Sequence, residues 1–254
     1  MHINNKNIYY QSKIDAKDLR VKQLIKDAFK LHPAYGHRRL AIYFKINKKR
    51  ILRVMNKFSL KPPRLWYQKK YITVKNDMYD HKLTNLIKNI INPKPNDVWV
   101  TDLTYIKYQQ KYLYLSVIQD ICTNEVLACN LGSKHDSVLV LQTIREAVLK
   151  QNTAPKIFHS DRGKENLADD CLSYLKSLGT KISVSDTAAP WQNGHVESFF
   201  SRFKSETGNL KRFEGLGKLT EYIYHFINYY NHERIVTRLK TSPVKYKQSL
   251  RMCS

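Results

Sequence analysis

Several features that would assign a protein class at once are missing from this 254-residue sequence. Glycine and proline number only eight each, which excludes collagen-like and low-complexity chains. No apolar run approaches the roughly 18 residues that suggest a membrane-spanning helix. The first residues also lack the apolar centre of a secretory signal. We therefore expect a cytoplasmic protein that does not enter a membrane.

Metal-binding and nucleophile motifs are also missing. The four cysteines include no Cys-x-x-Cys pair, which argues against a zinc finger and predicts reduced, mostly buried thiols. The segment from His232 to Val236 resembles the zinc-protease motif His-Glu-x-x-His, but Val236 stands where the second ligand would be. The sequence contains neither a P-loop nor a Gly-x-Ser-x-Gly motif. A zinc protease is therefore excluded, and no motif indicates a P-loop nucleotidase or a hydrolase with a Gly-x-Ser-x-Gly motif.

Acidic residues are scarce in the first 93 residues, which contain 22 Lys and Arg, five Asp and no Glu. The remaining 161 residues contain 22 basic and 16 acidic side chains. A basic N-terminal part joined to a more balanced C-terminal part indicates a polyanion-binding module attached to a second module. The alternative is a highly soluble or ribosome-associated basic protein.

Three short amphipathic helices are predicted in the basic part, over residues 18–31, 37–45 and 48–57, with Asn47 as the N-cap of the third. The third helix is cationic on one face, as in a helix-turn-helix unit, although small helical domains often have basic solvated faces. We predict a DNA-binding domain over residues 1–60. Its candidate DNA contacts are basic side chains of the second and third helices: Arg38, Arg39, Lys48, Lys49, Arg50 and Arg53.

Two proline clusters bracket a predicted linker over residues 61–97, with one helix near 80–91. Beyond it the pattern predicts three antiparallel strands (98–106, 112–118, 126–131), then helix 137–150, strand 156–159, helix 166–178, strand 181–184 and a helix from Asn193. The predicted fold class is α/β, with a mixed five-stranded sheet flanked by helices over residues 98–210. A helical extension is expected over residues 211–254.

Three acidic residues stand out by position. Asp102 lies inside the first strand, Asp161 directly follows the fourth, and Glu197 lies in the first turns of the helix from Asn193. Each has an ordinary explanation alone: an edge-strand acid, a turn residue, and an acid favoured by the helix dipole. Together they can converge, and such a group suits two Mg²⁺ ions, with Mn²⁺ as a substitute.

The spacing and surroundings of these acids resemble a known family. Thirty-five residues separate Asp161 from Glu197, and the three motifs lie in segments 98–105, 159–163 and 193–200. They resemble the DDE transposase and retroviral-integrase superfamily, in particular the downstream, catalytic product of bacterial insertion sequences with two overlapping reading frames. The likeness extends over residues 18–248 and includes the segment from Tyr229 to Arg234. It implies a ribonuclease-H-like catalytic core.

The resemblance also implies a function. The expected protein is a DNA transposase that cuts at insertion-sequence ends and joins the freed 3′-hydroxyl, with Asp102, Asp161 and Glu197 as catalytic metal ligands. Its expected partners are the terminal inverted repeats, target DNA, a second copy of itself on DNA, and an upstream-frame product. Two alternatives stay open: a related nuclease without strand transfer, and a non-catalytic DNA-binding regulator.

Further residues follow from the same likeness. Lys204 lies seven residues after Glu197, nearly two helical turns, so it shares a face with Glu197 and is expected to contact DNA. Trp191 and Asn193, at the entry to that helix, are further candidates for DNA contact. The sequence departs from many relatives at Lys164-Glu165-Asn166 and at Val236, and it lacks the zinc domain of retroviral integrases.

Overall fold

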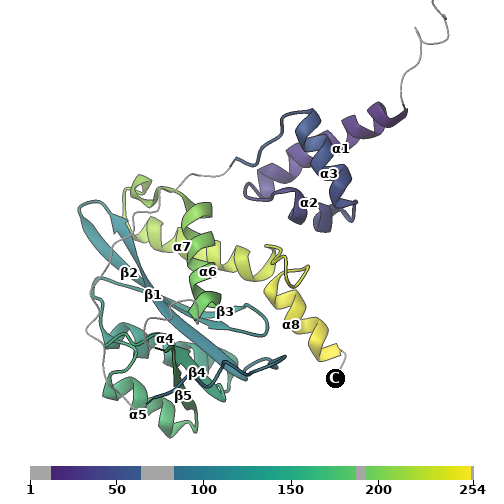
Figure 1. Cartoon of the computed structure of the whole chain (residues 1–254). Coiled ribbons are helices and arrows are strands. Elements are labelled where there is room, and N and C mark those ends of the chain that lie inside the picture. Colours follow the sequence, from purple (N-terminus) through teal and green to yellow (C-terminus); the bar gives the residue numbers. More distant parts are fainter. Residues whose placement is uncertain (1–12, 64–82, 187–192, 253–254) are drawn as a thin grey trace, which may run out of the picture. The chain divides into compact units, whose positions relative to one another are not determined.

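The computed structural model describes residues 13–63, 83–186 and 193–252 (Figure 1). The chain divides into two compact units. One comprises Met1–Arg64 together with Ile235–Thr241, and the other comprises Leu65–Arg234 together with Ser242–Ser254. Among the helices of the described ranges, none is long and apolar enough to cross a membrane.

The first unit contains three helices: α1 (Lys13–Leu31), α2 (His37–Phe44) and α3 (Lys48–Lys57). All three were predicted, although α1 begins five residues early because no glycine or proline interrupts the added turn. The predicted cap is confirmed, since the Asn47 side chain accepts a hydrogen bond from the Lys49 amide at 2.8 Å. Each helix contributes apolar side chains to one core: Val21, Ile25, Ala28, Leu40, Ile51, Val54 and Met55.

Tyr35 connects this core to a segment that is distant in the sequence. The Tyr35 ring is fully buried and stacks on His32 with 4.4 Å between ring centroids. Its hydroxyl accepts a hydrogen bond of 2.7 Å from the Ile235 amide, and Ile235 packs into the same core. The segment Ile235–Thr241, closed by a bridge between Val236 and Thr241, therefore folds as part of the helical unit.

The second unit is built on a five-stranded mixed sheet, which confirms the predicted fold class. Its strands are β1 (Val98–Tyr108), β2 (Lys111–Asp120), β3 (Val126–Gly132), β4 (Ile157–Ser160) and β5 (Lys181–Val184). Their order is β3-β2-β1-β4-β5. The first three strands pair antiparallel, and β1, β4 and β5 pair in parallel. The central strand β1 thus has an antiparallel neighbour on one side and a parallel neighbour on the other.

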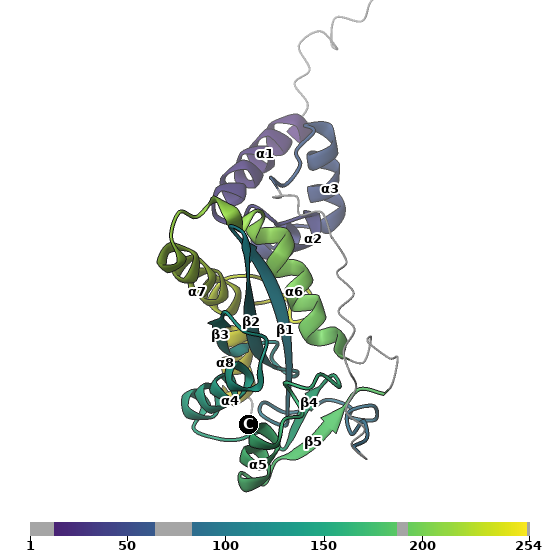
Figure 2. The same cartoon turned by 90° about the vertical axis from the view of Figure 1, so that its left-hand side faces the viewer.

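Helices cover both faces of this sheet (Figure 2). On one face α4 (Ser137–Gln151) and α5 (Asp169–Ser177) bury Trp99, Ile118 and Phe158. On the opposite face α6 (Gly194–Thr207) lies along β1, and α7 (Leu216–His232) packs on α6 through the ring pair Phe199–Tyr230. A short 3-10 turn (Leu210–Arg212) joins α6 to α7, and α8 (Pro243–Met252) follows. Because side chains alternate along a strand, Asp102 faces the α6 side while Trp99 and Leu103 face α4.

The described part of the predicted linker contradicts the expected helix near 80–91. Residues 83–91 are not helical and run beside β5 instead. The Val184 amide donates to the Thr84 carbonyl at 3.2 Å, and the Leu86 amide donates to Ser183 Oγ at 2.9 Å. These contacts cover the outer edge of β5, whose backbone groups would otherwise be open to another strand.

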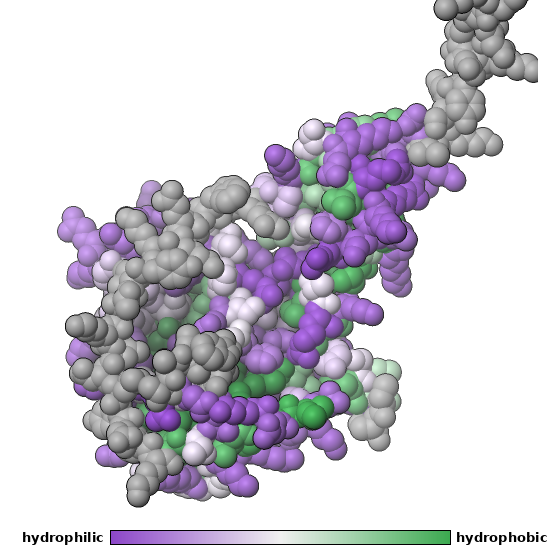
Figure 3. Space-filling model, in the orientation of Figure 1, coloured by the Kyte–Doolittle hydropathy of each residue, from purple (hydrophilic) through white to green (hydrophobic). Residues whose placement is uncertain are grey.

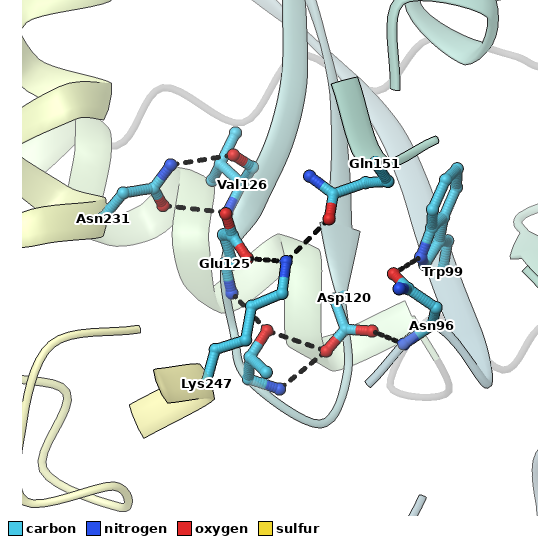
Figure 4. A network of polar contacts seen from close by, with 9 residues as sticks. Asn96, Trp99, Asp120, Glu125, Val126, Gln151, Asn231 and Lys247 are labelled. Atoms are coloured by element: carbon cyan, nitrogen blue, oxygen red, sulfur yellow. Dashed lines mark hydrogen bonds and ion pairs between the residues drawn. The ribbon is translucent and has the colours of Figure 1, made fainter. Parts of the chain in front are cut away.

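Buried polar contacts fix the turn between β2 and β3 (Figure 4). The Asp120 carboxylate accepts hydrogen bonds from the Thr123 amide at 2.7 Å, the Thr123 hydroxyl at 2.8 Å and the Asn96 amide at 2.8 Å. Lys247 on α8 reaches Glu125 at 2.8 Å and Gln151 at 2.6 Å. The C-terminal helix is therefore held to the sheet by a mostly buried lysine side chain.

The segment from Tyr229 to Arg234 has a structural role in this unit. The Asn231 side chain pairs with the Val126 backbone, accepting from its amide at 2.9 Å and donating to its carbonyl at 2.8 Å. Tyr230 accepts a hydrogen bond from Gln119 at 3.2 Å. Arg234, only 1% exposed, binds Glu206 at the end of α6 through two hydrogen bonds of 2.7 and 2.5 Å. This segment therefore holds α7 against β3 and α6.

Candidate active site

The register of the sheet brings two of the predicted acids level with each other. Val100 on β1 pairs with His159 on the parallel strand β4. Asp102 lies two residues beyond Val100, and Asp161 lies two residues beyond His159. In neighbouring parallel strands, residues at equal distance from a registered pair face the same side of the sheet. The two carboxylates therefore meet at the end of β4, on the face covered by α6.

Glu197 reaches this place from the first turn of α6. Asn193, at the start of that helix, donates a hydrogen bond of 3.1 Å to the Thr101 carbonyl, directly before Asp102. Val196 and Phe199 bury the inner face of the helix, whereas Glu197 remains exposed beside them. The buried residues of α6 thus fix the helix on the sheet, and Glu197 lies on the side of the helix that is near Asp102 and Asp161.

The electrostatics of Asp102 show that the three acids face one another. Burial raises the pKa of Asp102 well above its ordinary value, and the charges of Asp161, Glu197 and Glu165 raise it further. The Leu103 amide, which donates to its Oδ1 at 2.8 Å, opposes this shift. Desolvation and the charge of Asp161 also raise the pKa of Glu197. These acids repel one another when they are ionised.

Asp161 is held by a compact loop before α5. Its Oδ1 accepts hydrogen bonds from the Gly163 amide at 3.0 Å and from Asn166 Nδ2 at 2.8 Å. The predicted helix 166–178 begins only at Asp169, because residues 163–167 form a turn in which the Asn166 amide bonds to the Gly163 carbonyl. Sequence reasoning missed Asn166. The available signal was that Lys164-Glu165-Asn166 departs from the pattern expected from the family resemblance.

Glu165 is a fourth acid beside this loop, and it was also missed. Burial raises its pKa, the charge of Asp161 raises it further, and His135, whose Nε2 lies 3.4 Å from Glu165 Oε1, lowers it. A Cβ at position 163 would lie 2.5 Å from Glu165 Oε1 and 3.0 Å from Asp161 Oδ1. A larger residue here would therefore displace the Glu165 carboxylate and press on Asp161.

Lys204 lies on the same face of α6 as Glu197, as the helical spacing predicted. Burial lowers the pKa of Lys204, while the negative charge of Asp102 raises it. The ammonium group lies over the Tyr105 ring, 4.5 Å from its centroid. The structure therefore places a cation beside the acids. Its predicted contact with DNA stays a prediction.

Two further candidates for DNA contact, Asn193 and Trp191, are not described as exposed side chains. Asn193 is only 3% exposed and bonds to the β1 backbone, so its role in the structure is to position α6 rather than to meet DNA. Trp191 lies outside the described residues. We do not propose either residue as a DNA contact.

The end of β4 is fixed by polar contacts to β5. The buried His159 ring contacts Ser183 Oγ at 2.8 Å and Ser185 Oγ at 3.3 Å. Burial, together with the charge of His195, lowers the pKa of His159 to about 4. Arg162 donates to the carbonyls of Ser185 at 3.0 Å and Leu83 at 3.2 Å. A neutral histidine and a bound arginine thus flank Asp161 and limit its movement.

The acids suit a hard divalent cation in their chemistry. Such ions take carboxylate oxygens, and their charge removes the repulsion that raises the pKa of Asp102. The loop also contains an unsatisfied acceptor, because Asn166 Oδ1 is buried without a hydrogen-bond partner in the described part of the chain. Among the described residues, however, no three His, Cys, Asp or Glu side chains already form a metal-binding group. The donor set fits Mg²⁺, but its coordination shell is not preformed.

The six basic candidates in the helical unit divide by their contacts. Arg53 forms a two-pronged ion pair with Asp18, with both N–O distances 2.7 Å. Arg39 donates to the Ala34 carbonyl at 3.2 Å, and Arg50 donates to the Lys17 carbonyl at 3.3 Å. Arg38, Lys48 and Lys49 are exposed, as Arg53 partly is, but they form no hydrogen bond or ion pair in the described part of the chain, and the visible surface of this unit is mainly hydrophilic (Figure 3). Arg53 thus stabilises the unit, whereas these three are the most accessible to a polyanion.

The fold and the family matches define a class, which is that of integrase core domains. Residues 92–190 and 178–239 match two families that are both described as integrase core domain. A protein of the simian T-cell lymphotropic virus intasome, solved in complex with PP2A regulatory subunit B56 gamma, shares the fold with a TM-score of 0.51. It is 16% identical, and the match covers 86% of this chain and 73% of that chain.

Sequence relatives narrow the class to a family. An uncharacterized transposase-like protein of Haemophilus influenzae is 34% identical, over 81% of this chain and 95% of its own length. The putative transposase InsK for insertion sequence IS150 of Escherichia coli is 30% identical, over 86% and 79%. A 31 kDa protein of insertion element IS600 from Shigella sonnei is 31% identical, over 91% and 88%. The chain therefore belongs to the bacterial insertion-sequence transposases with an integrase-like core.

Proposed function

We propose that this protein is a DNA transposase that cuts strands at insertion-sequence ends and transfers the freed 3′-hydroxyl to target DNA. Asp102, Asp161 and Glu197 would hold Mg²⁺, with Mn²⁺ as a substitute. When bound, the metal supplies activation of the attacking oxygen and neutralises charge on the phosphate. The observation that carries the proposal is the position of Asp102, whose pKa is raised by burial and by the charges of Asp161 and Glu197.

The residues of the chain provide position and charge in this proposal. β1 and β4 hold Asp102 and Asp161 level, and α6 brings Glu197 over them. Lys204, stacked on Tyr105 beside Asp102, binds a DNA phosphate next to the scissile bond. A positioned cation there holds the phosphodiester in line for attack, which is the main contribution that a protein makes to phosphoryl transfer.

The helical unit contributes DNA binding. Its exposed side chains Arg38, Lys48 and Lys49 neutralise phosphates, which strengthens binding in low salt. We further propose that two copies assemble on paired element ends, and that an upstream-frame product contributes to recognition. The protein would work in the cytoplasm, on DNA that includes its own terminal inverted repeats.

The test is a cleavage and joining assay with labelled element ends and a target duplex, in the presence and absence of Mg²⁺. We expect wild-type protein to nick the ends and join them to target. Glu197→Gln should lose both products while it retains DNA binding. The matched control is Glu221→Gln, which changes an exposed acid on α7 and should leave both products unchanged.

The other outcomes separate the alternatives. Hydrolysis of DNA without joined products would indicate a nuclease and overturn the transposase proposal. Salt-sensitive DNA binding without cleavage in any metal, with or without the upstream product, would indicate a regulator. Cleavage that survives in Glu197→Gln would remove Glu197 from the catalytic set.

A further inference from the structure

The loop after β4 controls which oxygen of Asp161 is free to bind a ligand. Both hydrogen bonds to this carboxylate, from the Gly163 amide and from Asn166 Nδ2, reach Oδ1. In the described part of the chain no hydrogen bond reaches Oδ2. Two donors on one oxygen fix the orientation of the carboxylate and leave the second oxygen available.

Asn166 is built into this place with an unsatisfied group. Its side chain is 2% exposed, and Oδ1 is buried without a hydrogen-bond partner in the described ranges. An unpaired buried acceptor is unfavourable, and an apolar side chain of similar size would avoid it. Residues that lower stability locally are common at functional sites. In the described ranges, the one hydrogen bond of the Asn166 side chain goes to Asp161 Oδ1.

The backbone around Asn166 is arranged for the same contact. Its amide bonds to the Gly163 carbonyl at 3.1 Å, which closes the turn and delays the start of α5 to Asp169. Leu167, the next residue, is 1% exposed and packs with Leu172 and Val184. The backbone of Asn166 is thus held on both sides, which places its side chain within hydrogen-bond distance of Asp161.

We propose that Asn166 is a positioning residue that orients the Asp161 carboxylate for divalent-cation binding. The inference rests on the proposed function, because it takes Asp161 as a metal ligand. Residues that hydrogen-bond a metal ligand orient it, and their loss weakens metal affinity by about 10–100-fold. Asn166 would act through Asp161, without touching the DNA.

The experiment measures Mn²⁺ and Mg²⁺ binding to the full chain by calorimetry, together with the thermal unfolding midpoint. Asn166→Leu removes the donor and keeps the branching of the side chain in a larger volume, and Asn166→Ala is the second variant, which removes the donor without adding volume. The control is Ser242→Ala, which also removes a buried polar atom without a hydrogen-bond partner, from a residue directly before α8. We expect both variants, measured below their unfolding midpoints, to weaken cation binding by about 10–100-fold. Ser242→Ala should bind as wild type does.

The remaining outcomes contradict either this inference or the proposed function on which it rests. If Asn166→Leu does not fold, Asn166→Ala is measured in its place, below its own unfolding midpoint. Wild-type affinity in the folded variant, or a loss no larger than that of Ser242→Ala, would show that the amide does not orient a ligand. If the wild-type protein binds no cation, the metal requirement of the proposed function is contradicted. If the wild-type protein and Asn166→Leu bind the cation with equal affinity, only this inference is contradicted.

Discussion

Two buried or partly buried aspartates in the two units have opposite surroundings. In the helical unit Asp18 is fully buried and faces Arg53 and Lys57, whose hydrogen bonds and charges lower its pKa. In the sheet unit Asp102 faces Asp161, Glu197 and Glu165, and its pKa is raised. Lys204 is the cation that faces Asp102, but it does not reverse this shift. An aspartate thus forms a stabilising ion pair in the helical unit, whereas an aspartate in the sheet unit is repelled by neighbouring acids when it is ionised.

The difference shows where stability and function separate. An acid with its own basic partners needs nothing further, and its ion pair connects α1 to α3. Acids gathered without enough basic partners are unfavourable in the isolated protein, and such groups concentrate at functional sites. The comparison therefore supports the acids of the sheet unit as a site, by an argument independent of motif spacing.

The strongest way to break this comparison is to neutralise each aspartate. Asp102→Asn should reduce the rate of Mg²⁺-dependent cleavage by about 10³-fold or more, because it removes a proposed metal ligand. It should also keep or raise the unfolding midpoint, since like-charge repulsion is relieved. Asp18→Asn should do the reverse, lowering the midpoint and leaving the chemistry intact. Strand-cleavage assays and calorimetry of both variants check this, and a large loss of stability in Asp102→Asn would contradict it.

A second prediction concerns the buried ion pair between Arg234 and Glu206. Arg234→Met should destabilise the protein by about 3–5 kcal/mol, because Glu206 would be left as an uncompensated, nearly buried charge. The double variant Arg234→Met/Glu206→Leu should recover much of that loss. Denaturant unfolding measures both values. Equal loss in the single and double variants would show that packing, rather than charge, is responsible.

A third prediction sharpens the division of basic residues in the helical unit. Lys48→Ala should reduce the slope of log affinity against log salt by about one, because one phosphate contact is lost. Its unfolding midpoint should not change, since Lys48 is exposed. Arg53→Ala should lower the midpoint of the helical unit, because Asp18 loses its main partner. Fluorescence binding at several salt concentrations, with thermal unfolding, distinguishes the two roles.

The smallest expected effect is a pH dependence of the helical unit. The folded pKa of Asp18 lies below its ordinary value of 3.8. Its contribution to stability is therefore fully present above about pH 3.8 and is lost as pH falls through the lower folded pKa. Hydrogen exchange of α1 and α3 between pH 5 and 2 should show this loss in wild type. Asp18→Asn should lack that component, and an identical pH profile in both would refute the assignment.

Local patterns predicted most of the elements. The alternation over Val98–Ile106 identified β1, the Asn47 side chain identified the start of α3, and the spacing of Asp161 and Glu197 identified the acids. The first two features depend on residues that are near one another in the chain, and the third depends on a spacing shared with a family, so a sequence reading can find all three. The helix predicted near 80–91 was wrong because contacts with β5 outweighed the local preference.

The sequence by itself determined which residues could do chemistry and in which elements they stand. Only the tertiary structure decided how Arg53, Asn193 and Asn166 are used, and that Ile235–Thr241 folds with the helical unit. Three of these four outcomes depend on partners far along the chain: Asp18 is 35 residues from Arg53, and Tyr35 is 200 residues from Ile235. Asn166 is the exception, because Asp161 is only five residues away, but their contact needs a turn where local periodicity favours helix. Propensity and spacing act over a few residues, whereas ion pairs, buried amides and strand register are set by the packed fold.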